Sequence, residues 1–340
     1  MAAVASSSHS STADSPLLMV KFGGFKMPGS SSPNIQDSCC FEGLYAGFQE
    51  VVYRVHEMKN AFGTNDVDHF CVQVQDYVSV LMDREKNRLK YQGNSPERAA
   101  RPTMVKFMMQ IAEGEELTRA TLHLAMYLYD RFADCHSIPI TQLWLAALCC
   151  LVIAGKLEER DAKTPKVRKL QAYLPAAATF STRLFTELEK YILDYFKWSL
   201  LLPNAYTFLE FFALFIIDAH EERNLREIES NNNNNFLSFS LQDGHFSTRN
   251  VNTIRFFAVE VLDTLLCEEP NDDFPPSLVA ASTMMLSRRV HGYCDWSERL
   301  QFITKYSKAQ VLTCCQMYIQ KIYESQSTKC CCSDSSYPKL

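Results

Sequence analysis

Apolar residues recur at spacings of three and four along most of the chain between residues 66 and 323, as in helices with one buried face. Over residues 66–89 the apolar positions of this pattern are Val67, Phe70, Val74, Tyr77, Val78, Leu81 and Met82. The turn-forming sequence YQGNSPE follows directly and would end a helix. The pattern therefore predicts an amphipathic helix over 66–89.

Five further helical patterns follow before Pro203. Their expected spans are 99–112, 118–133, 141–155, 164–173 and 181–196. The third contains an uncharged run from Leu143 to Ala154 and is apolar on all sides. A helix of that kind is surrounded by protein. We expect a helical domain built around this one buried helix.

A second set of helical patterns follows Pro203, and strand patterns are scarce throughout the chain. The expected helices are 204–219, 250–266, 276–290, a short one near 296–302, and 307–323. Two sets of five helices of similar length suggest a structural duplication. The fold class expected is all-α, with two tandem five-helix domains.

Composition divides the rest of the chain. Residues 1–38 contain ten serines and too few large apolar side chains to become ordered. The insertion at about 220–249 contains five consecutive asparagines and is expected to be mobile. The expected organisation is a Ser-rich disordered region (1–64), an N-terminal helix (65–98), two helical domains (99–202 and 203–324), and a Cys-rich tail (325–340).

Charge and targeting signals exclude several classes of protein. The formal net charge of the 340 residues is -5, which argues against a general nucleic-acid binder. The apolar run is shorter than the ~20 residues that cross a bilayer, and no basic region precedes an apolar segment at the N-terminus. We expect an intracellular protein of the nucleus or cytoplasm that binds no membrane.

No pattern of an enzyme or a metal site is found. The 13 cysteines include adjacent pairs and the triplet 330–332 but no Cys-x-x-Cys. The sequence has no P-loop, no Gly-x-Ser-x-Gly and no His-Glu-x-x-His, and its histidines are scattered. We expect no catalytic residue, no metal and no cofactor.

Some charged residues stand in apolar surroundings. Asp130 lies in LAMYLYDRF, where burying an ionised group is costly unless a cation compensates it, and Arg101 is a well-placed candidate. Lys156 follows the central helix, and Glu189 lies within the last helix of the first set. From residue types alone, two structural salt bridges are the simplest interpretation.

Three segments resemble helices of the cyclin box. They are TLHLAMYLYDRF, LAALCCLVIAGKLEE and FTELEKYILDYFKWSLLLPNAYTFLEFF. All five signature positions of the box are matched, by Arg101, Asp130, Leu145, Lys156 and Glu189, and the resemblance covers residues 65 to about 323. Within the family, YQGNSPERAARPTMVKFM and PPSLVAASTMMLSRR are most similar to the cyclin J subfamily.

The resemblance implies two tandem cyclin-fold domains, no catalysis, and a heterodimer with a cyclin-dependent protein kinase that the chain activates in cell-cycle control. It also implies that the movable helix of the kinase docks on a face carrying Lys156, Leu157, Glu158, Glu189 and Trp198. Arg101 and Asp130 would form a structural ion pair, and Leu145 would belong to the core.

One part of the family pattern is altered. Cyclins that recruit substrates through Arg-x-Leu motifs carry Met-Arg-x-Ile-Leu at the first helix of the box, and here the stretch is Ala100-Arg101-Pro102-Thr103-Met104. Two apolar contacts of the docking groove are missing. We expect at most a degenerate groove for weak substrate docking, lined by Met104, Phe107, Leu143 and Trp144.

Two alternatives remain open. General initiation factors of the IIB type share the tandem fold and bind DNA, and the run RDAKTPKVRK at 160–169 supplies basic residues for phosphate contacts. The negative net charge and the lack of a preceding zinc ribbon disfavour this reading. The other alternative is a scaffold that binds no kinase, which the retention of Lys156 and Glu189 disfavours.

Overall fold

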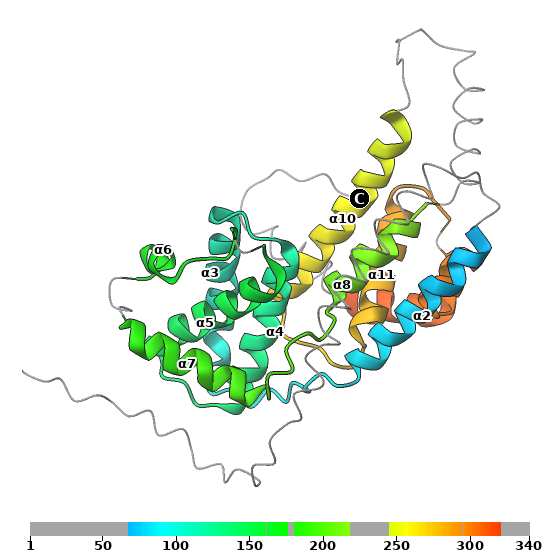
Figure 1. Cartoon of the computed structure of the whole chain (residues 1–340). Coiled ribbons are helices and arrows are strands. Elements are labelled where there is room, and N and C mark those ends of the chain that lie inside the picture. Colours follow the sequence, from blue (N-terminus) through cyan, green and yellow to red (C-terminus); the bar gives the residue numbers. More distant parts are fainter. Residues whose placement is uncertain (1–66, 161, 176–179, 218–244, 295, 321–340) are drawn as a thin grey trace, which may run out of the picture. The chain divides into compact units, whose positions relative to one another are not determined.

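The computed structural model describes residues 67–160, 162–175, 180–217, 245–294 and 296–320, all within one compact unit. Across these ranges the chain is helical, with no β-strand (Figure 1). The all-α expectation is confirmed. The expectations for the Ser-rich N-terminal region, most of the insertion at 220–249 and the cysteine triplet lie outside the described residues.

The first domain is built around helix α5, as the apolar run predicts (Figure 1). Its helices are α3 (Arg101–Gly114), α4 (Arg119–Cys135), α5 (Ile140–Glu158), α6 (Val167–Leu170) and α7 (Thr182–Tyr195). Helix α5 contacts α3, α4 and α7. Between Leu143 and Gly155 only Trp144 is not fully buried.

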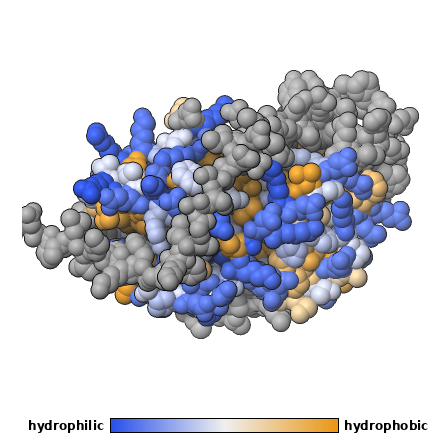
Figure 2. All heavy atoms as spheres, turned by 60° about the horizontal axis from the view of Figure 1, so that its bottom comes forward, coloured by the Kyte–Doolittle hydropathy of each residue, from blue (hydrophilic) through white to orange (hydrophobic). Residues whose placement is uncertain are grey.

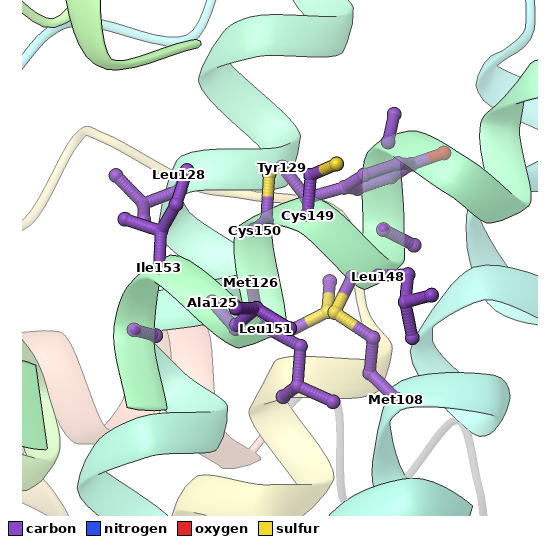
Figure 3. Packing of buried hydrophobic residues seen from close by; sticks show 14 of the residues in the cluster. Met108, Ala125, Met126, Leu128, Tyr129, Leu148, Cys149, Cys150, Leu151 and Ile153 are labelled. Carbon is purple, nitrogen blue, oxygen red and sulfur yellow. The ribbon is translucent and has the colours of Figure 1, made fainter. Parts of the chain in front are cut away.

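The interior of this domain combines aliphatic and sulfur-containing side chains with aromatic ones. Figure 3 shows Met108, Met126, Leu148 and Leu151 packed together, and Cys149 and Cys150 are buried free thiols. Helix α5 is long and apolar enough to cross a bilayer by length and composition alone, but 67% of that stretch is buried inside the domain. Its apolar character is that of a core helix.

Side-chain caps fix where several helices begin. The Thr118 Oγ1 atom accepts from the Thr121 backbone N–H at 3.3 Å, and Ser181 Oγ accepts from Leu184 N–H at 3.1 Å. At the start of the second domain, Asn204 and Thr207 form a capping box. Each cap satisfies a backbone donor that has no partner within the helix.

The second domain surrounds helix α11 (Figure 1). Its described helices are α8 (Ala205–Phe212), α10 (His245–Cys267), α11 (Pro276–Val290), α12 (Glu298–Thr304) and α13 (Lys308–Cys314). Helix α11 contacts α8, α10 and α13, together with the π-helical turn η6 (Cys315–Gln320). This is again a buried helix covered by its neighbours.

The N-terminal helix α2 (Val67–Glu85) belongs to the core of the second domain, although the first domain follows it in sequence. Val78 and Leu81 are buried in that core, and α2 contacts α11 and α12. The Glu85 carboxylate accepts hydrogen bonds from the Ser277 backbone N–H at 3.0 Å and the Ser277 hydroxyl at 2.6 Å. Helix α2 therefore comes before the first domain in sequence but packs in the core of the second domain.

Two expected helices are shorter than the apolar pattern suggests. The segment 164–173 forms only α6 and a 3₁₀ turn, η3 (Gln171–Tyr173), and the segment 204–219 forms α8 followed by the 3₁₀ turn η5 (Ala213–Phe215). The apolar spacing continues through a 3₁₀ turn, because that turn also places every third residue on one face. The spacing of apolar residues alone therefore does not distinguish an α-helix from a 3₁₀ turn.

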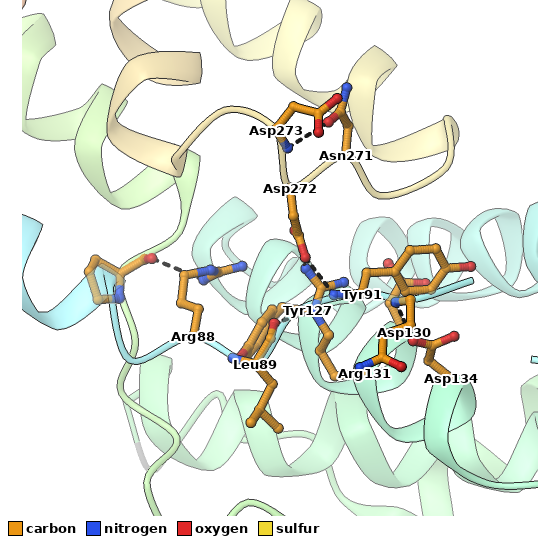
Figure 4. A network of polar contacts seen from close by, with 12 residues as sticks. Arg88, Leu89, Tyr91, Tyr127, Asp130, Arg131, Asp134, Asn271, Asp272 and Asp273 are labelled. Carbon is orange, nitrogen blue, oxygen red and sulfur yellow. Dashed lines mark hydrogen bonds and ion pairs between the residues drawn. The ribbon is translucent and has the colours of Figure 1, made fainter. Parts of the chain in front are cut away.

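Polar contacts join the two domains (Figure 4). Asp272, in the loop after α10, accepts from the Tyr91 backbone N–H and from Arg131 Nη2, each at 2.5 Å. On α10, Asp263 forms an ion pair with Arg119 at 3.0 Å and contacts His123 Nε2 at 3.1 Å. These contacts tie helix α4 to the second domain.

Candidate functional site

Lys156 and Glu189 come together on the surface of the first domain. Lys156 lies in the last turn of α5 and Glu189 in the middle of α7, and Lys156 Nζ is 2.5 Å from Glu189 Oε1. The lysine side chain is 52% exposed and the glutamate side chain 14%. The structure therefore presents a preformed ion pair whose cation faces solvent.

The end of α5 that carries this pair is fastened to the beginning of α4. Glu159 Oε1 accepts from the Thr118 backbone N–H and from the Thr121 hydroxyl, both at 2.6 Å. A carboxylate at a helix N-terminus is stabilised by the free N–H groups and the positive end of the helix dipole. Glu159 thus holds Lys156, three residues earlier, at a fixed place.

Gly155 lets the following loop cross close to α5. A Cβ atom at this position would lie 2.6 Å from Pro165 Cδ and 2.9 Å from Pro165 Cγ. Both contacts are too short for any side chain larger than hydrogen unless the loop moves. The close approach of Pro165 therefore accounts for glycine at position 155.

Glu158 is a partly buried carboxylate beside the pair. Burial, and to a smaller extent the neighbouring Glu159 carboxylate, together raise its pKa from the ordinary value of 4.5 to about 7. Leu157, between these charges, is half-buried and packs against the apolar core. The surface at the end of α5 is therefore only partly hydrated.

Trp198 is positioned by the way α7 ends. The Trp198 N–H donates to the Leu193 carbonyl at 2.9 Å and the Lys197 N–H to the Asp194 carbonyl at 3.0 Å, the two bonds of a Schellman motif. Lys197 and Trp198 both have positive φ values, 51° and 59°, in a region that side chains disfavour. Trp198 Nε1 donates to Asp194 Oδ1 at 3.0 Å, and the side chain is 64% exposed.

We call Lys156, Leu157, Glu158, Glu189 and Trp198 the α5–α7 surface. The structure joins Lys156 to Glu189, whereas the Trp198 side chain bonds Asp194 and has no hydrogen bond or ring contact with that pair in the described part of the chain. In the face shown in Figure 2, hydrophilic residues cover most of the described surface and hydrophobic ones form separate patches. Trp198, in the turn after α7, is thus a large hydrophobic side chain exposed on a mostly hydrophilic protein.

Arg101 and Asp130 form a buried ion pair. Arg101 Nε and Nη2 lie 2.8 and 3.0 Å from the two carboxylate oxygens, and the side chains are 8% and 7% exposed. Burial raises the pKa of Asp130, while the Arg101 guanidinium acts in the opposite direction. Arg101 Nη2 also donates to the Leu266 carbonyl at 3.1 Å, at the C-terminal end of α10. The pair joins α3, α4 and the second domain.

The residues expected to line a docking groove are mostly covered. Met104, Phe107 and Leu143 are 2%, 5% and 1% exposed and belong to the core, as does Leu145. Trp144 is half-buried, with its ring edge-on to Phe107 at a centroid distance of 4.8 Å. Only Trp144 of the four is partly accessible, and substrate docking here stays a prediction.

Two features were not predicted from the sequence: the contacts that join the two domains, and the hydrogen bonds of Glu159 to the start of α4. Arg131 is 4% exposed and donates to the Leu89 carbonyl at 2.6 Å as well as to Asp272. The available signal was the number of polar residues in the otherwise apolar helix α4, where His123 and Asp134 are also buried. Among the described residues, no cluster of three His, Cys, Asp or Glu has the arrangement of a metal site.

Comparison with family models gives two adjacent matches. The model described as the cyclin N-terminal domain matches residues 75–201, and the model of the cyclin C-terminal domain matches residues 203–339. The first includes Lys156, Glu189 and Trp198. Together the two matches extend over most of the described helices.

Curated relatives give the same picture. The chain is 31% identical to cyclin-J of Homo sapiens over 154 residues, which is 43% of this chain and 41% of the relative. It is 26% identical to cyclin-J of Xenopus laevis over 254 residues, which is 70% of this chain and 59% of the relative. The chain thus spans about half the length of these relatives.

A solved structure shows a similar fold. The X-ray structure of a viral cyclin from herpesvirus saimiri aligns with a TM-score of 0.54 and 16% sequence identity. The alignment covers 74% of this chain and 99% of the viral one. At this identity the likeness concerns the fold: two helical domains in tandem.

Proposed function

The chain belongs to the cyclin family, and from this premise we propose that it is a non-catalytic regulatory subunit that binds and activates a cyclin-dependent protein kinase in cell-cycle control. The observation that carries the proposal is the ion pair of Lys156 and Glu189 on the α5–α7 surface. The proposed role belongs to the nucleus or cytoplasm and requires no cofactor.

The pair has bonding capacity left for a partner. The Lys156 ammonium has three donors, and only its bond to Glu189 Oε1 is found among the described residues. The second carboxylate oxygen of Glu189 is also an acceptor. Together they can bond the backbone groups at the end of a docked helix while remaining bonded to each other.

The apolar residues of the surface supply the rest of the contact. Trp198 is 64% exposed and is held by the end of α7, so little conformational freedom is lost when a partner covers it. Tryptophan is among the residues that most often dominate binding energy at interfaces. Leu157 adds an apolar contact next to Lys156.

Activation follows from where the partner helix is held. A protein kinase needs an internal Lys–Glu ion pair, and the glutamate of that pair lies on a movable helix. A protein that binds the inward position of this helix more tightly than the outward position shifts the kinase toward its active state. The extent of activation is set by that difference in affinity.

The test is to truncate each member of the pair and measure kinase binding. Lys156→Ala and Glu189→Ala should each weaken binding by ~2–5 kcal/mol, roughly thirty-fold to several-thousand-fold, because the remaining charge is desolvated without its partner. The measurement is calorimetry or quantitative pull-down against a panel of purified cyclin-dependent kinases, together with kinase activity.

The matched control is Lys163→Ala, in the exposed basic loop outside the α5–α7 surface. It should leave kinase binding unchanged. In helix α6, which follows that loop, Lys169 forms an ion pair with Glu115 at 2.7 Å, which reduces the positive charge available for DNA. Normal kinase binding by Lys156→Ala, with loss of DNA binding in Lys163→Ala, would replace the proposal with the initiation-factor alternative. A chain that binds none of the kinases would be a scaffold.

A further inference from the structure

A surface cavity, which we call the α2 cleft, lies between helix α2 and the loops and turns of the second domain. It is a cleft of about 560 Å³ that opens to solvent. Its walls are the last turns of α2, the connection at 86–90, the loop at 272–276 and the turn at 305–306. The cleft shares no residue with the α5–α7 surface.

Basic side chains converge on this cleft. Lys86, Arg88, Lys90 and Lys305 all line it. Of these four cations, only Lys86 forms an ion pair, with Asp83 at 2.7 Å; Arg88, Lys90 and Lys305 have no described carboxylate within ion-pair distance. Lys305 Nζ donates to the Ser79 hydroxyl, a neutral partner. The cleft therefore holds three cations that form no ion pair with a described carboxylate.

The carboxylates of the cleft form their hydrogen bonds and ion pairs with groups other than Arg88, Lys90 and Lys305. Asp83 is engaged with Lys86, and Glu85 with the backbone and hydroxyl of Ser277. Asp272 points away toward the first domain, where it bonds Arg131 (Figure 4). Each acid is bonded to another group. Glu85 and Asp272 act on Arg88, and Asp83 on Lys305, only as nearby charges, so the N–H donors of these cations stay available to a ligand.

Arg88 is the most organised of the three cations. Its Nη1 donates to the Pro203 carbonyl at 3.0 Å, and its guanidinium carbon stacks 3.9 Å from the centroid of the Tyr127 ring. Burial lowers the pKa of this guanidinium to about 10, which leaves it charged at neutral pH. The described part of the chain provides no other hydrogen bond for this side chain, so further donors of its planar fork remain for an anion.

The neighbouring wall is apolar. Phe274, Pro275, Pro276 and Tyr306 line the cleft beside the cations. A charged fork with ammonium groups around it suits a phosphate monoester, which carries nearly two negative charges at neutral pH. The apolar wall suits the side chains that flank such a group in a peptide.

We propose that this cleft binds a phosphorylated serine or threonine carried on a peptide segment of a partner protein. Arg88 holds the phosphate with its planar fork, Lys90 and Lys305 add charge, and Phe274 with the two prolines contacts the adjacent residues. The proposal does not depend on kinase binding at the α5–α7 surface, because the two sites use different residues.

The experiment uses the full chain and a fluorescent peptide library with one fixed phosphoserine. Fluorescence polarisation should show binding that the unphosphorylated library lacks and that weakens as salt is raised. Lys90→Glu and Lys305→Glu, both at exposed positions, should each weaken binding roughly ten- to hundredfold, as expected for loss of a charge-assisted contact. Arg88→Gln should weaken it at least as much.

The control is Lys163→Glu, which makes the same charge change outside the cleft and should leave peptide binding intact. Arg88 also contacts Tyr127 and Pro203, so Arg88→Gln can disturb the fold. Its result is therefore interpreted together with those of the two lysine variants. Equal binding of both libraries, no binding of either, or unchanged binding in both lysine variants would each overturn the proposal. Inorganic phosphate binding as tightly as the phosphorylated library would overturn its peptide part.

Discussion

Two ion pairs of the first domain, both made of residues that match the cyclin signature, have opposite surroundings. Arg101 and Asp130 are 8% and 7% exposed and lie where α3, α4 and α10 meet. Lys156 and Glu189 are 52% and 14% exposed and lie at the surface of α5 and α7. Residue types and spacing do not distinguish these pairs; burial does.

The difference also appears in how fully each cation is bonded. Arg101 uses two nitrogens on Asp130 and reaches the carbonyls of Leu266 and Cys267. The Lys156 ammonium donates to one oxygen, Glu189 Oε1, and otherwise faces solvent. A buried, fully bonded pair contributes to the fold, whereas an exposed pair with free donors is available to a partner.

The largest expected effect comes from breaking the buried pair. Asp130→Ala should reduce the free energy of unfolding by ~3–5 kcal/mol, because Arg101 would remain buried without a counter-charge. Urea denaturation followed by circular dichroism measures this loss. The control is Glu187→Ala, which breaks the exposed pair with Arg183 and should change stability by less than about 0.5 kcal/mol. Equal stability of the two variants would contradict the comparison.

The next effect concerns the dehydrated carboxylate beside the exposed pair. Glu158 has a folded pKa of about 7 and an ordinary value of 4.5, so the folded state binds more protons between these pH values. Stability contributed by this group should therefore fall as pH rises from 4.5 to 7. Glu158→Gln should remove that fall and gain at most about 3 kcal/mol near pH 8.

The measurement is urea denaturation of both proteins at several pH values. The two stability curves should meet near pH 4.5 and separate as pH increases. Parallel curves would show that Glu158 is as well hydrated as an ordinary surface glutamate.

A smaller effect tests the support of the exposed pair. Gly155→Ala should destabilise the protein by ~1–3 kcal/mol, because the new methyl group would overlap Pro165 and force the loop to move. The double variant Gly155→Ala with Pro165→Ala should recover part of that loss, since it removes the overlapping atoms. Thermal denaturation compares the single and double variants. If the double variant recovers no stability, overlap with Pro165 is not the cause of the loss.

The smallest expected effect is on stability when the exposed pair is broken. Lys156→Ala should change the free energy of unfolding by less than about 0.5 kcal/mol, because the Lys156 ammonium is half exposed and water screens its attraction to Glu189. The same variant should lose kinase binding. A loss of stability comparable to that of Asp130→Ala would show that the two pairs have the same role.

Much of the fold was predictable because hydrophobic spacing is a local signal. The uncharged run from Leu143 to Ala154 predicts the core helix, and Pro276 marks the first residue of α11. The location of α2 was not predictable, since its apolar face shows that Val78 and Leu81 are buried but not against which domain. That choice depends on side chains about two hundred residues later, such as Ser277.

The candidate site was partly predictable for the same reason. Family resemblance identified Lys156 and Glu189, but their 2.5 Å contact depends on how α7 crosses α5. The Schellman end of α7 was not foreseen, because Lys197 occupies a position where glycine is usual. The role of Glu159 depends on its meeting Thr118, 41 residues away in the chain.

The exposure of Trp198 gives the protein a built-in optical reporter. The chain has three tryptophans, of which Trp296 is 6% exposed and Trp198 64% exposed. Indole fluorescence shifts to shorter wavelength when water is removed from the ring. A partner that covers the α5–α7 surface would therefore change the emission spectrum of the unlabelled chain, whereas a ligand in the α2 cleft, whose lining includes no tryptophan, would leave it nearly constant.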